Sequence, residues 1–289
     1  MPCRDAFIDT RTPGSDKKEN FTIIGPGVSE NPNQHIHIAE PHGFNIGGAR
    51  QPPGCTNSQH SHETAEVFFV HSGVWAFRLG EHGETAEIVL EPGDLISIPT
   101  HVFRGFENVG ETEGFLWAVL GGDDPGRVLW APKVFDMAED YGLVLLENGN
   151  LVDVGAGQAL PLDIVAMPRT SPEQVAELQT LDDAALAKCC VRGQDRGVFI
   201  GPEGPLSWPH GFTLERVKLE TGQASEPITL DVPDVLFVHA GELDVVVDGE
   251  GVTLRPGDTF TVPTGRSRQL SSKTGADFIR VIGQADDAA

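Results

Sequence analysis

The sequence predicts an all-β protein made of two copies of one antiparallel barrel or sandwich. Two sequence blocks occur twice and in the same order, and short apolar segments alternate with turn residues. Turn formers are abundant, with 34 Gly and 21 Pro in 289 residues. A chain of this length is long enough for one large or two ordinary domains.

The recurring blocks define an internal repeat. EVFFVHSG begins at Glu66 and DVLFVHAG at Asp234, 168 residues later. LEPGDLISIPT begins at Leu90 and LRPGDTFTVPT at Leu254, 164 residues later. The offset falls by four residues because the first copy has a longer hairpin around residues 79–86. The shared order and nearly constant offset predict a duplicated domain.

Each copy consists of short apolar segments that Gly, Pro, Asp and Asn interrupt every ~8–12 residues, a spacing typical of antiparallel sandwiches and barrels. The strands expected in the first copy are 67–70, 74–78, 88–90, 95–98 and 115–120. The strands expected in the second copy are 212–219, 235–238, 243–247, 259–262 and 278–282.

Between the copies, one helix is expected over residues 172–190. Ser171 is a good N-cap, Pro172 suits the first helical position, and Gln174 completes a capping-box pattern. Cys189 then becomes a small buried apolar residue. The expected domains are an N-terminal arm (1–35), a first barrel (36–125), a linker (126–195) and a second barrel (196–285).

Composition excludes several partners. The formal net charge is −23 and the pI is about 4.6, which argues against binding nucleic acid or anionic lipid. The four cysteines have neither zinc-ribbon spacing nor a disulfide framework, which fits a reducing compartment. No segment has the length of a signal-peptide core or a membrane span. We therefore expect a cytoplasmic protein.

One cluster of residues indicates metal chemistry. His60 and His62 have the same parity on a strand, and Glu66 follows four residues later with the same parity. Two imidazoles and one carboxylate that converge on a barrel interior form a first-row metal site. Gly54 and Gly73 frame this stretch.

These residues resemble the first motif of the cupin family, G-x5-H-x-H-x3-E-x6-G, without a spacing error. In the second family motif, G-x5-P-x-G-x2-H-x3-N, three positions match, at Gly93, Pro99 and Asn108. His101 stands where the glycine is expected, and Arg104 where the fourth metal ligand, a histidine, is expected. The resemblance covers about two-thirds of the chain. It implies two tandem cupin jelly-roll (double-stranded β-helix) barrels with a short helical linker and metal inside the first barrel.

The departure at Arg104 leaves three alternatives open, because a guanidinium has no lone pair to give a metal. His60, His62 and Glu66 form a three-ligand site with open positions, His101 replaces the missing ligand, or the site binds metal weakly or not at all. Arg104 itself either binds an anionic substrate or pairs with an acid as part of the scaffold. Arg50 is a second candidate for binding an anionic substrate.

The second copy serves as an internal comparison. Ile228 and Leu230 stand at the positions of the two histidines, Asp234 at that of Glu66 and Arg268 at that of Arg104. The second barrel is therefore expected to hold no metal. An arginine in both copies favours the scaffold role somewhat.

The resemblance implies a metal-dependent enzyme similar to quercetinase-like and gentisate-dioxygenase-like cupins. We expect a non-haem dioxygenase that acts on a small organic acid or phenolic compound. Fe(II) is favoured as the divalent metal, and Mn(II), Ni(II) and Zn(II) are alternatives. The competing hypotheses are a non-redox metal-dependent isomerase or lyase and a non-catalytic small-molecule-binding cupin. A homodimer is a further expectation from the resemblance.

Overall fold

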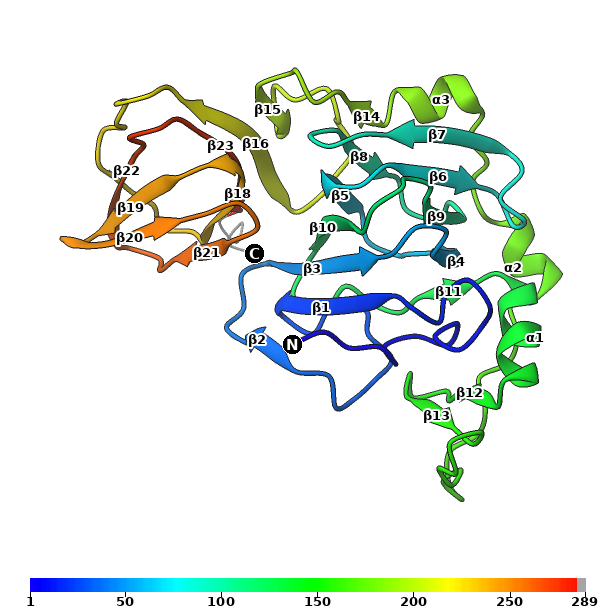
Figure 1. The fold of residues 1–289 in the computed structure, drawn as a ribbon. Helices are drawn as coiled ribbons and strands as arrows, with labels where there is room; N and C mark the ends of the chain where they lie inside the picture. Colours follow the sequence, from blue (N-terminus) through cyan, green and yellow to red (C-terminus); the bar gives the residue numbers. More distant parts are fainter. Residues whose placement is uncertain (285–289) are drawn as a thin grey trace. The chain divides into compact units, whose positions relative to one another are not determined.

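A computed structural model describes residues 1–284, which fold mainly into β-strands (Figure 1). They divide into two compact units. The first unit comprises residues 1–40, 45–120 and 124–193, and the second begins with two short segments, 41–44 and 121–123, before residues 194–284. The all-β fold class predicted from the sequence is confirmed.

The first unit contains two large sheets. The seven-stranded sheet has the order β14 (Cys190–Val191), β8 (Leu95–Ile98), β5 (Glu66–Ser72), β10 (Gly114–Gly121), β3 (Phe44–Gln51), β1 (Glu19–Ile24) and β2 (Ile36–Ile38). The five-stranded sheet has the order β11 (Leu129–Trp130), β4 (Thr56–Ser61), β9 (Arg104–Asn108), β6 (Trp75–Leu79) and β7 (Ala86–Leu90). A separate hairpin joins β12 (Leu143–Leu145) to β13 (Leu151–Asp153).

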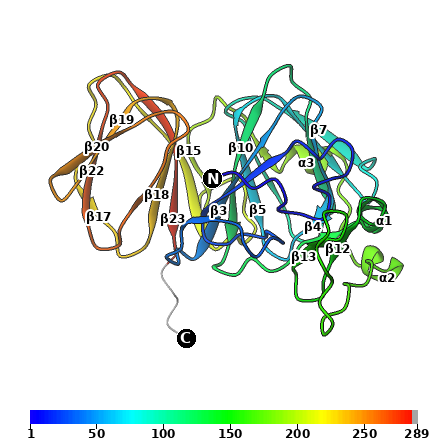
Figure 2. The same ribbon diagram turned by 60° about the horizontal axis from the view of Figure 1, so that its bottom comes forward.

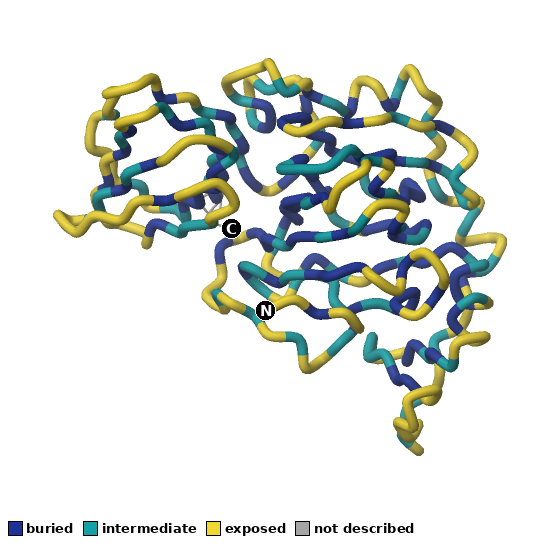
Figure 3. The backbone as a smooth tube through the Cα atoms, viewed as in Figure 1, coloured by how far each residue is buried: buried dark blue, intermediate teal, exposed yellow. Residues whose placement is uncertain are grey.

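Aromatic side chains fill the space between these two sheets. Phe68 on β5 contacts Phe77 on β6 and Phe106 on β9, with ring centroids 5.3 and 5.2 Å apart. Apolar burial of this kind is the main favourable contribution to folding. Figure 3 shows the result, with buried stretches along the strands and exposed residues concentrated in the loops. The apolar residues 67–70 of β5 are all buried, which explains why this strand is continuously apolar instead of alternating.

The second unit repeats this two-layer arrangement, which Figure 2 shows nearly edge-on. One sheet has the order β15 (Gly197–Ile200), β16 (Phe212–Leu219), β23 (Ala276–Gly283), β18 (Asp234–Gly241) and β21 (Thr259–Val262). The other has the order β17 (Ile228–Thr229), β22 (Ser267–Ser271), β19 (Leu243–Val247) and β20 (Glu250–Leu254). Every strand expected from the sequence in either copy is present.

Strand register shows that the repeat is structural. In the first unit, β5 pairs with β8 so that Glu66 lies opposite Ile98. In the second unit, β18 pairs with β21 so that Asp234 lies opposite Val262. Glu66 and Asp234, the first residues of the repeated segments EVFFVHSG and DVLFVHAG, therefore have equivalent places in their own sheets.

The helical region differs from the sequence expectation. Residues 172–190 form two short helices, α2 (Pro172–Ala176) and α3 (Asp183–Ala187), instead of one. Ser171 and Gln174 do form the expected capping box of α2. The break arises because the backbone N–H of Gln179 donates to the carbonyl of His101 at 2.6 Å, and because Asp182 starts a new helix as its N-cap. A longer helix, α1 (Pro132–Asp140), precedes this region, and α3 lies beside β7 (Figure 1).

The first 35 residues are part of the first unit instead of a separate arm. β1 pairs with β3, and a buried ion pair connects Lys18 to Asp9. Lys18 Nζ also donates to Oδ1 of Asn57 on β4, at 2.8 Å. The segment is therefore anchored to both large sheets. Among residues 1–284, no helix is both long and apolar enough to cross a membrane.

We expect Lys18→Met to destabilise the protein by about 3–5 kcal/mol, because it leaves the buried Asp9 carboxylate without its cation. Urea unfolding followed by fluorescence measures this change. Arg4→Met is the matched control, since Arg4 pairs with Glu19 but its side chain is 75% exposed; its cost should stay below about 1 kcal/mol. Equal costs for the two variants would contradict the anchoring role.

Candidate metal centre

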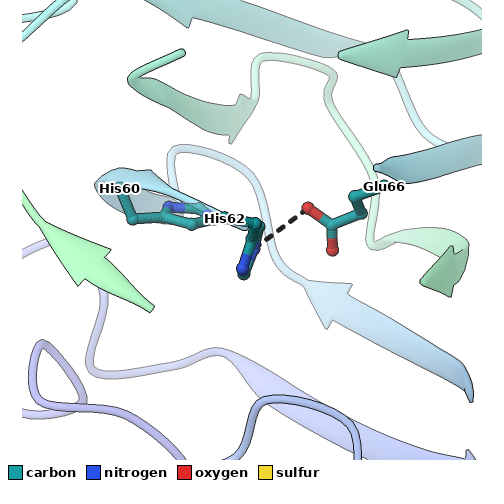
Figure 4. A group of neighbouring side chains, drawn as sticks. All are labelled: His60, His62 and Glu66. Carbon is teal, nitrogen blue, oxygen red and sulfur yellow. Dashed lines mark ion pairs between the residues drawn. The ribbon is translucent and has the colours of Figure 1, made fainter. Parts of the chain in front are cut away.

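Three buried side chains meet inside the first barrel. His60 lies on β4, His62 directly follows that strand, and Glu66 begins β5. One ligand atom from each lies within 4.8 Å of the other two. Figure 4 shows the three side chains, with the contact between Nε2 of His62 and Oε2 of Glu66 at 3.2 Å. The structure thus brings together the three residues that the sequence proposed as ligands.

Hydrogen bonding orients the first histidine. Nδ1–H of His60 donates to the carbonyl of Ser58 at 2.7 Å, which leaves Nε2 with its lone pair free for a metal. Within residues 1–284, Nδ1 of His62 has no hydrogen-bond partner. The two imidazole rings meet edge to face, with centroids 4.9 Å apart.

Burial and nearby charges set the protonation states. Burial lowers the pKa of His60 well below its usual value, and burial together with Arg104 lowers that of His62. Burial alone would raise the pKa of Glu66, but His62 and Arg104 outweigh it and hold that pKa at about 2. Near neutral pH the cluster therefore consists of two neutral imidazoles and a carboxylate.

Arg104 is fully buried beside this cluster. It lies on β9 opposite His60, and its Nη2 donates to Oε2 of Glu66 at 3.1 Å. Its Nη1 donates to the carbonyl of Val102 at 3.2 Å. Arg104 does not belong to the wall of the cavity described below. These contacts support the scaffold alternative, in which the guanidinium holds the metal-facing carboxylate.

The second barrel contains the same pair. Arg268 on β22 lies opposite Ile228, and its Nε donates to Oδ2 of Asp234 at 2.6 Å. The space around these groups is closed, with a cavity volume of about 0 Å³. A buried arginine–carboxylate pair thus occurs in both barrels, with and without neighbouring imidazoles.

The remaining two candidates are not part of the three-residue cluster. His101 is exposed and lines an outer pocket of about 460 Å³ together with His62, Glu63 and Arg127. Its φ of 59° is a left-handed conformation that favours glycine, the residue that the second cupin motif has there. Arg50 pairs with Glu19 at 2.7 Å outside the cavity wall. Fourth-ligand and substrate-binding roles for these two residues stay predictions.

A largely apolar cavity of about 80 Å³ faces the cluster. Its wall includes the three candidate ligands and aromatic rings from several elements. The aromatic members are Phe7, Phe21, Phe68, Phe106 and Trp130. No Lys or Arg belongs to the wall within the part of the chain that the structure describes.

Sequence reasoning missed a buried acid next to this wall. Glu30 accepts hydrogen bonds from Nε1 of Trp130 and from the backbone N–H of Ile8, both at 2.6 Å. The Trp130 ring in turn packs against His60, with centroids 5.4 Å apart. Burial outweighs these donors and raises the pKa of Glu30 to about 8. No local motif marks Glu30, because its partner Trp130 is 100 residues away in the sequence.

The cluster fits a divalent first-row metal. Two neutral imidazole nitrogens and one carboxylate are the donor set of open facial sites, and they leave coordination positions for other ligands. A closed structural zinc site has four protein ligands. The cluster found among residues 1–284 offers three.

Comparison with known proteins agrees with this description. Residues 49–120 match the family described as the cupin domain. A germin-like protein, subfamily 1 member 4, from Arabidopsis thaliana is 31% identical over 144 residues. That match covers 46% of this chain and 63% of the plant protein, so the chain spans less than two-thirds of that relative.

Solved structures of two enzymes resemble most of the chain. A salicylate 1,2-dioxygenase variant from Pseudoaminobacter salicylatoxidans in complex with gentisate has a TM-score of 0.54 at 19% identity, covering 83% of this chain and 68% of the dioxygenase. A Bacillus subtilis oxalate decarboxylase variant has a TM-score of 0.56 at 12% identity, covering 94% and 74%. Residues 49–120 therefore form a cupin domain, and the fold of the chain resembles that of these two enzymes.

We expect His60→Ala to remove bound metal, because two ligands hold a divalent ion much less tightly than three. Elemental analysis of purified protein measures the metal content. His101→Ala is the comparison: full metal content in this variant is expected from the exposed position of His101. Full metal content in His60→Ala would rule out the proposed centre, and metal loss in His101→Ala would restore His101 as a ligand.

We expect Glu30 to stabilise the protein at low pH. Its pKa is about 8 in the folded state and near 4.5 when unfolded, so between these values the folded state binds more protons. Its contribution is complete below pH 4.5 and is lost as the pH rises through 8, with a slope of at most about 1.4 kcal/mol per pH unit. Urea unfolding of wild type and Glu30→Gln across this range measures the difference. Parallel stability curves would show that Glu30 is already ionised in the folded protein.

Proposed function

We propose that the protein is a metal-dependent dioxygenase that acts on a small organic acid or phenolic compound, with Fe(II) as the favoured metal. The observation that carries this proposal is the three-residue cluster facing a largely apolar cavity. When bound, the metal supplies Lewis-acid and one-electron redox chemistry at its open positions.

The chain's own residues hold and protect this centre. Ser58 fixes the tautomer of His60, and Arg104 orients the Glu66 carboxylate. Phe68, Phe106 and Trp130 keep the cavity apolar, which strengthens electrostatic interactions within it and excludes water from the reacting groups.

The charge of the wall restricts the substrate. The only ionised side chain among the described wall residues is the Glu66 carboxylate, so the metal is the cation that an acidic substrate meets. We therefore propose that the anionic group of the substrate faces the metal. Its remaining atoms lie against uncharged surfaces.

The cavity also limits size. Its volume of about 80 Å³ is smaller than the ~150 Å³ cavity that admits a benzene ring in an engineered protein. A substrate of a few non-hydrogen atoms fits without rearrangement, and a phenolic ring requires the wall to move. The proposal therefore favours a small organic acid over a phenol.

A non-redox reaction is the second candidate, and the similarity to an oxalate decarboxylase structure favours it. In that case the metal polarises an acid or carbonyl group of the substrate without consuming oxygen. An isomerase or lyase of this kind would use the same three ligands and the same cavity.

We expect protein loaded with Fe(II) to consume oxygen when small hydroxy acids, oxo acids or phenols are added, and to lose this activity on chelation. Oxygen-electrode assays measure the uptake. Zn(II)-loaded protein is the control, because zinc has no redox chemistry and should be inactive. Substrate conversion without oxygen uptake, retained with Zn(II), would replace the dioxygenase with the non-redox enzyme. If the protein showed neither oxygen uptake nor substrate conversion, the non-catalytic binding protein would be the remaining hypothesis.

A further inference from the structure

Besides Nδ1 of the candidate ligand His62, two polar side-chain atoms of residues in the cavity wall have no hydrogen-bond partner within residues 1–284. They are Nδ2 of Asn20 and Oε1 of Gln34. Other polar wall groups are engaged: Thr22 Oγ1 donates to the carbonyl of His35 at 2.5 Å, and Asn57 Oδ1 accepts from Lys18 at 2.8 Å. Buried polar atoms are normally paired, so unpaired ones in a cavity indicate groups that a ligand pairs with.

Asn20 is held firmly in this position. It lies on β1 with 9% of its surface exposed. Its backbone exchanges hydrogen bonds with Cys3, at 2.7 and 2.8 Å, and its strand pairs with β3 opposite Ala49. With the backbone held on both sides, the carboxamide stays directed into the barrel interior.

Gln34 contributes from the turn before β2. Its backbone N–H donates to the carbonyl of Asn31 at 3.1 Å, which fixes the turn. β1 is separated from β5, the strand of Glu66, by β3 and β10 in the sheet order. Two strands therefore separate Asn20 from the candidate ligand Glu66 within this sheet.

We propose that Asn20 and Gln34 bind an uncharged hydroxyl group of the substrate, so that the substrate is a small organic acid with a hydroxyl group remote from the metal. This inference rests on the metal-dependent function proposed above. A hydroxyl has both functions that these atoms lack a partner for, because it can accept from Nδ2 of Asn20 and donate to Oε1 of Gln34.

Other groups fit less well. A methyl group leaves both carboxamide atoms unpaired. A carboxylate has no proton for Oε1 of Gln34, and an ammonium has no acceptor for Nδ2 of Asn20. The absence of Lys and Arg from the described wall also argues against a second negative charge on the substrate.

The experiment uses lactate and glycerate of matched configuration, which differ by one terminal hydroxyl. Both are titrated into Co(II)-loaded protein, with the cobalt absorption spectrum and calorimetry as readouts, and into metal-free protein by calorimetry. We expect wild type to bind glycerate on the order of 10–100-fold more tightly than lactate, because lactate leaves the buried carboxamide atoms unpaired. Asn20→Leu and Gln34→Met should reduce this ratio towards one and leave lactate binding nearly unchanged.

Gln51→Met is the matched control, because both amide atoms of Gln51 are buried and unpaired within residues 1–284 but Gln51 is not part of the cavity wall. It should keep the wild-type ratio. Equal affinities of wild type for the two acids, failure of both to bind, or an unchanged ratio in both Asn20→Leu and Gln34→Met would overturn the inference.

The outcome is separable from the proposed function. Selective glycerate binding without oxygen uptake would sustain the hydroxyl site and remove the dioxygenase. Oxygen uptake by a protein that binds glycerate and lactate equally would support the dioxygenase and rule out the hydroxyl site.

Discussion

The buried contact between Arg104 and Glu66 is the interaction on which the site depends. It connects β9 of one sheet to β5 of the other, and together with the larger effect of His62 it holds the pKa of Glu66 low inside the barrel. An arginine that replaces a ligand with a fixed positive charge also opposes a metal cation a few ångströms away. The centre is therefore expected to bind metal less tightly than a four-ligand centre. In exchange, the carboxylate has a fixed orientation and the metal keeps open positions.

The second barrel clarifies the role of this contact. Arg268 and Asp234 form the same pair, and Arg280 adds a second hydrogen bond to Asp234 at 2.8 Å. There the histidine positions hold Ile228 and Leu230, and the interior is closed. A buried arginine–carboxylate pair thus connects the two sheets in each of the two barrels. In the first barrel the same pair lies beside the imidazoles of His60 and His62, which complete the candidate metal centre.

The N-terminal segment determines much of what the cavity offers a ligand. Phe7, Asn20, Phe21, Val28 and Gln34 all belong to the wall and all precede residue 49, where the cupin domain match begins. The buried Lys18 anchors this segment to both sheets. The candidate metal ligands therefore lie within the cupin-domain match, while a segment outside it supplies several of the polar and aromatic groups of the cavity wall.

The sequence by itself determined the duplicated all-β fold, part of its strands and the three candidate ligands. Each of these follows from local spacing: alternating side chains along a strand, turn residues between strands, and His60, His62 and Glu66 at fixed intervals. The continuous helix over residues 172–190 was wrong, because a long-range hydrogen bond between Gln179 and His101 interrupts it. Only the tertiary structure decided that Arg104 pairs with Glu66, that Arg50 pairs with Glu19, and that Glu30, Asn20 and Gln34 approach the cavity. These contacts join residues up to 100 positions apart, and no local periodicity encodes which distant side chains meet when two sheets close on each other.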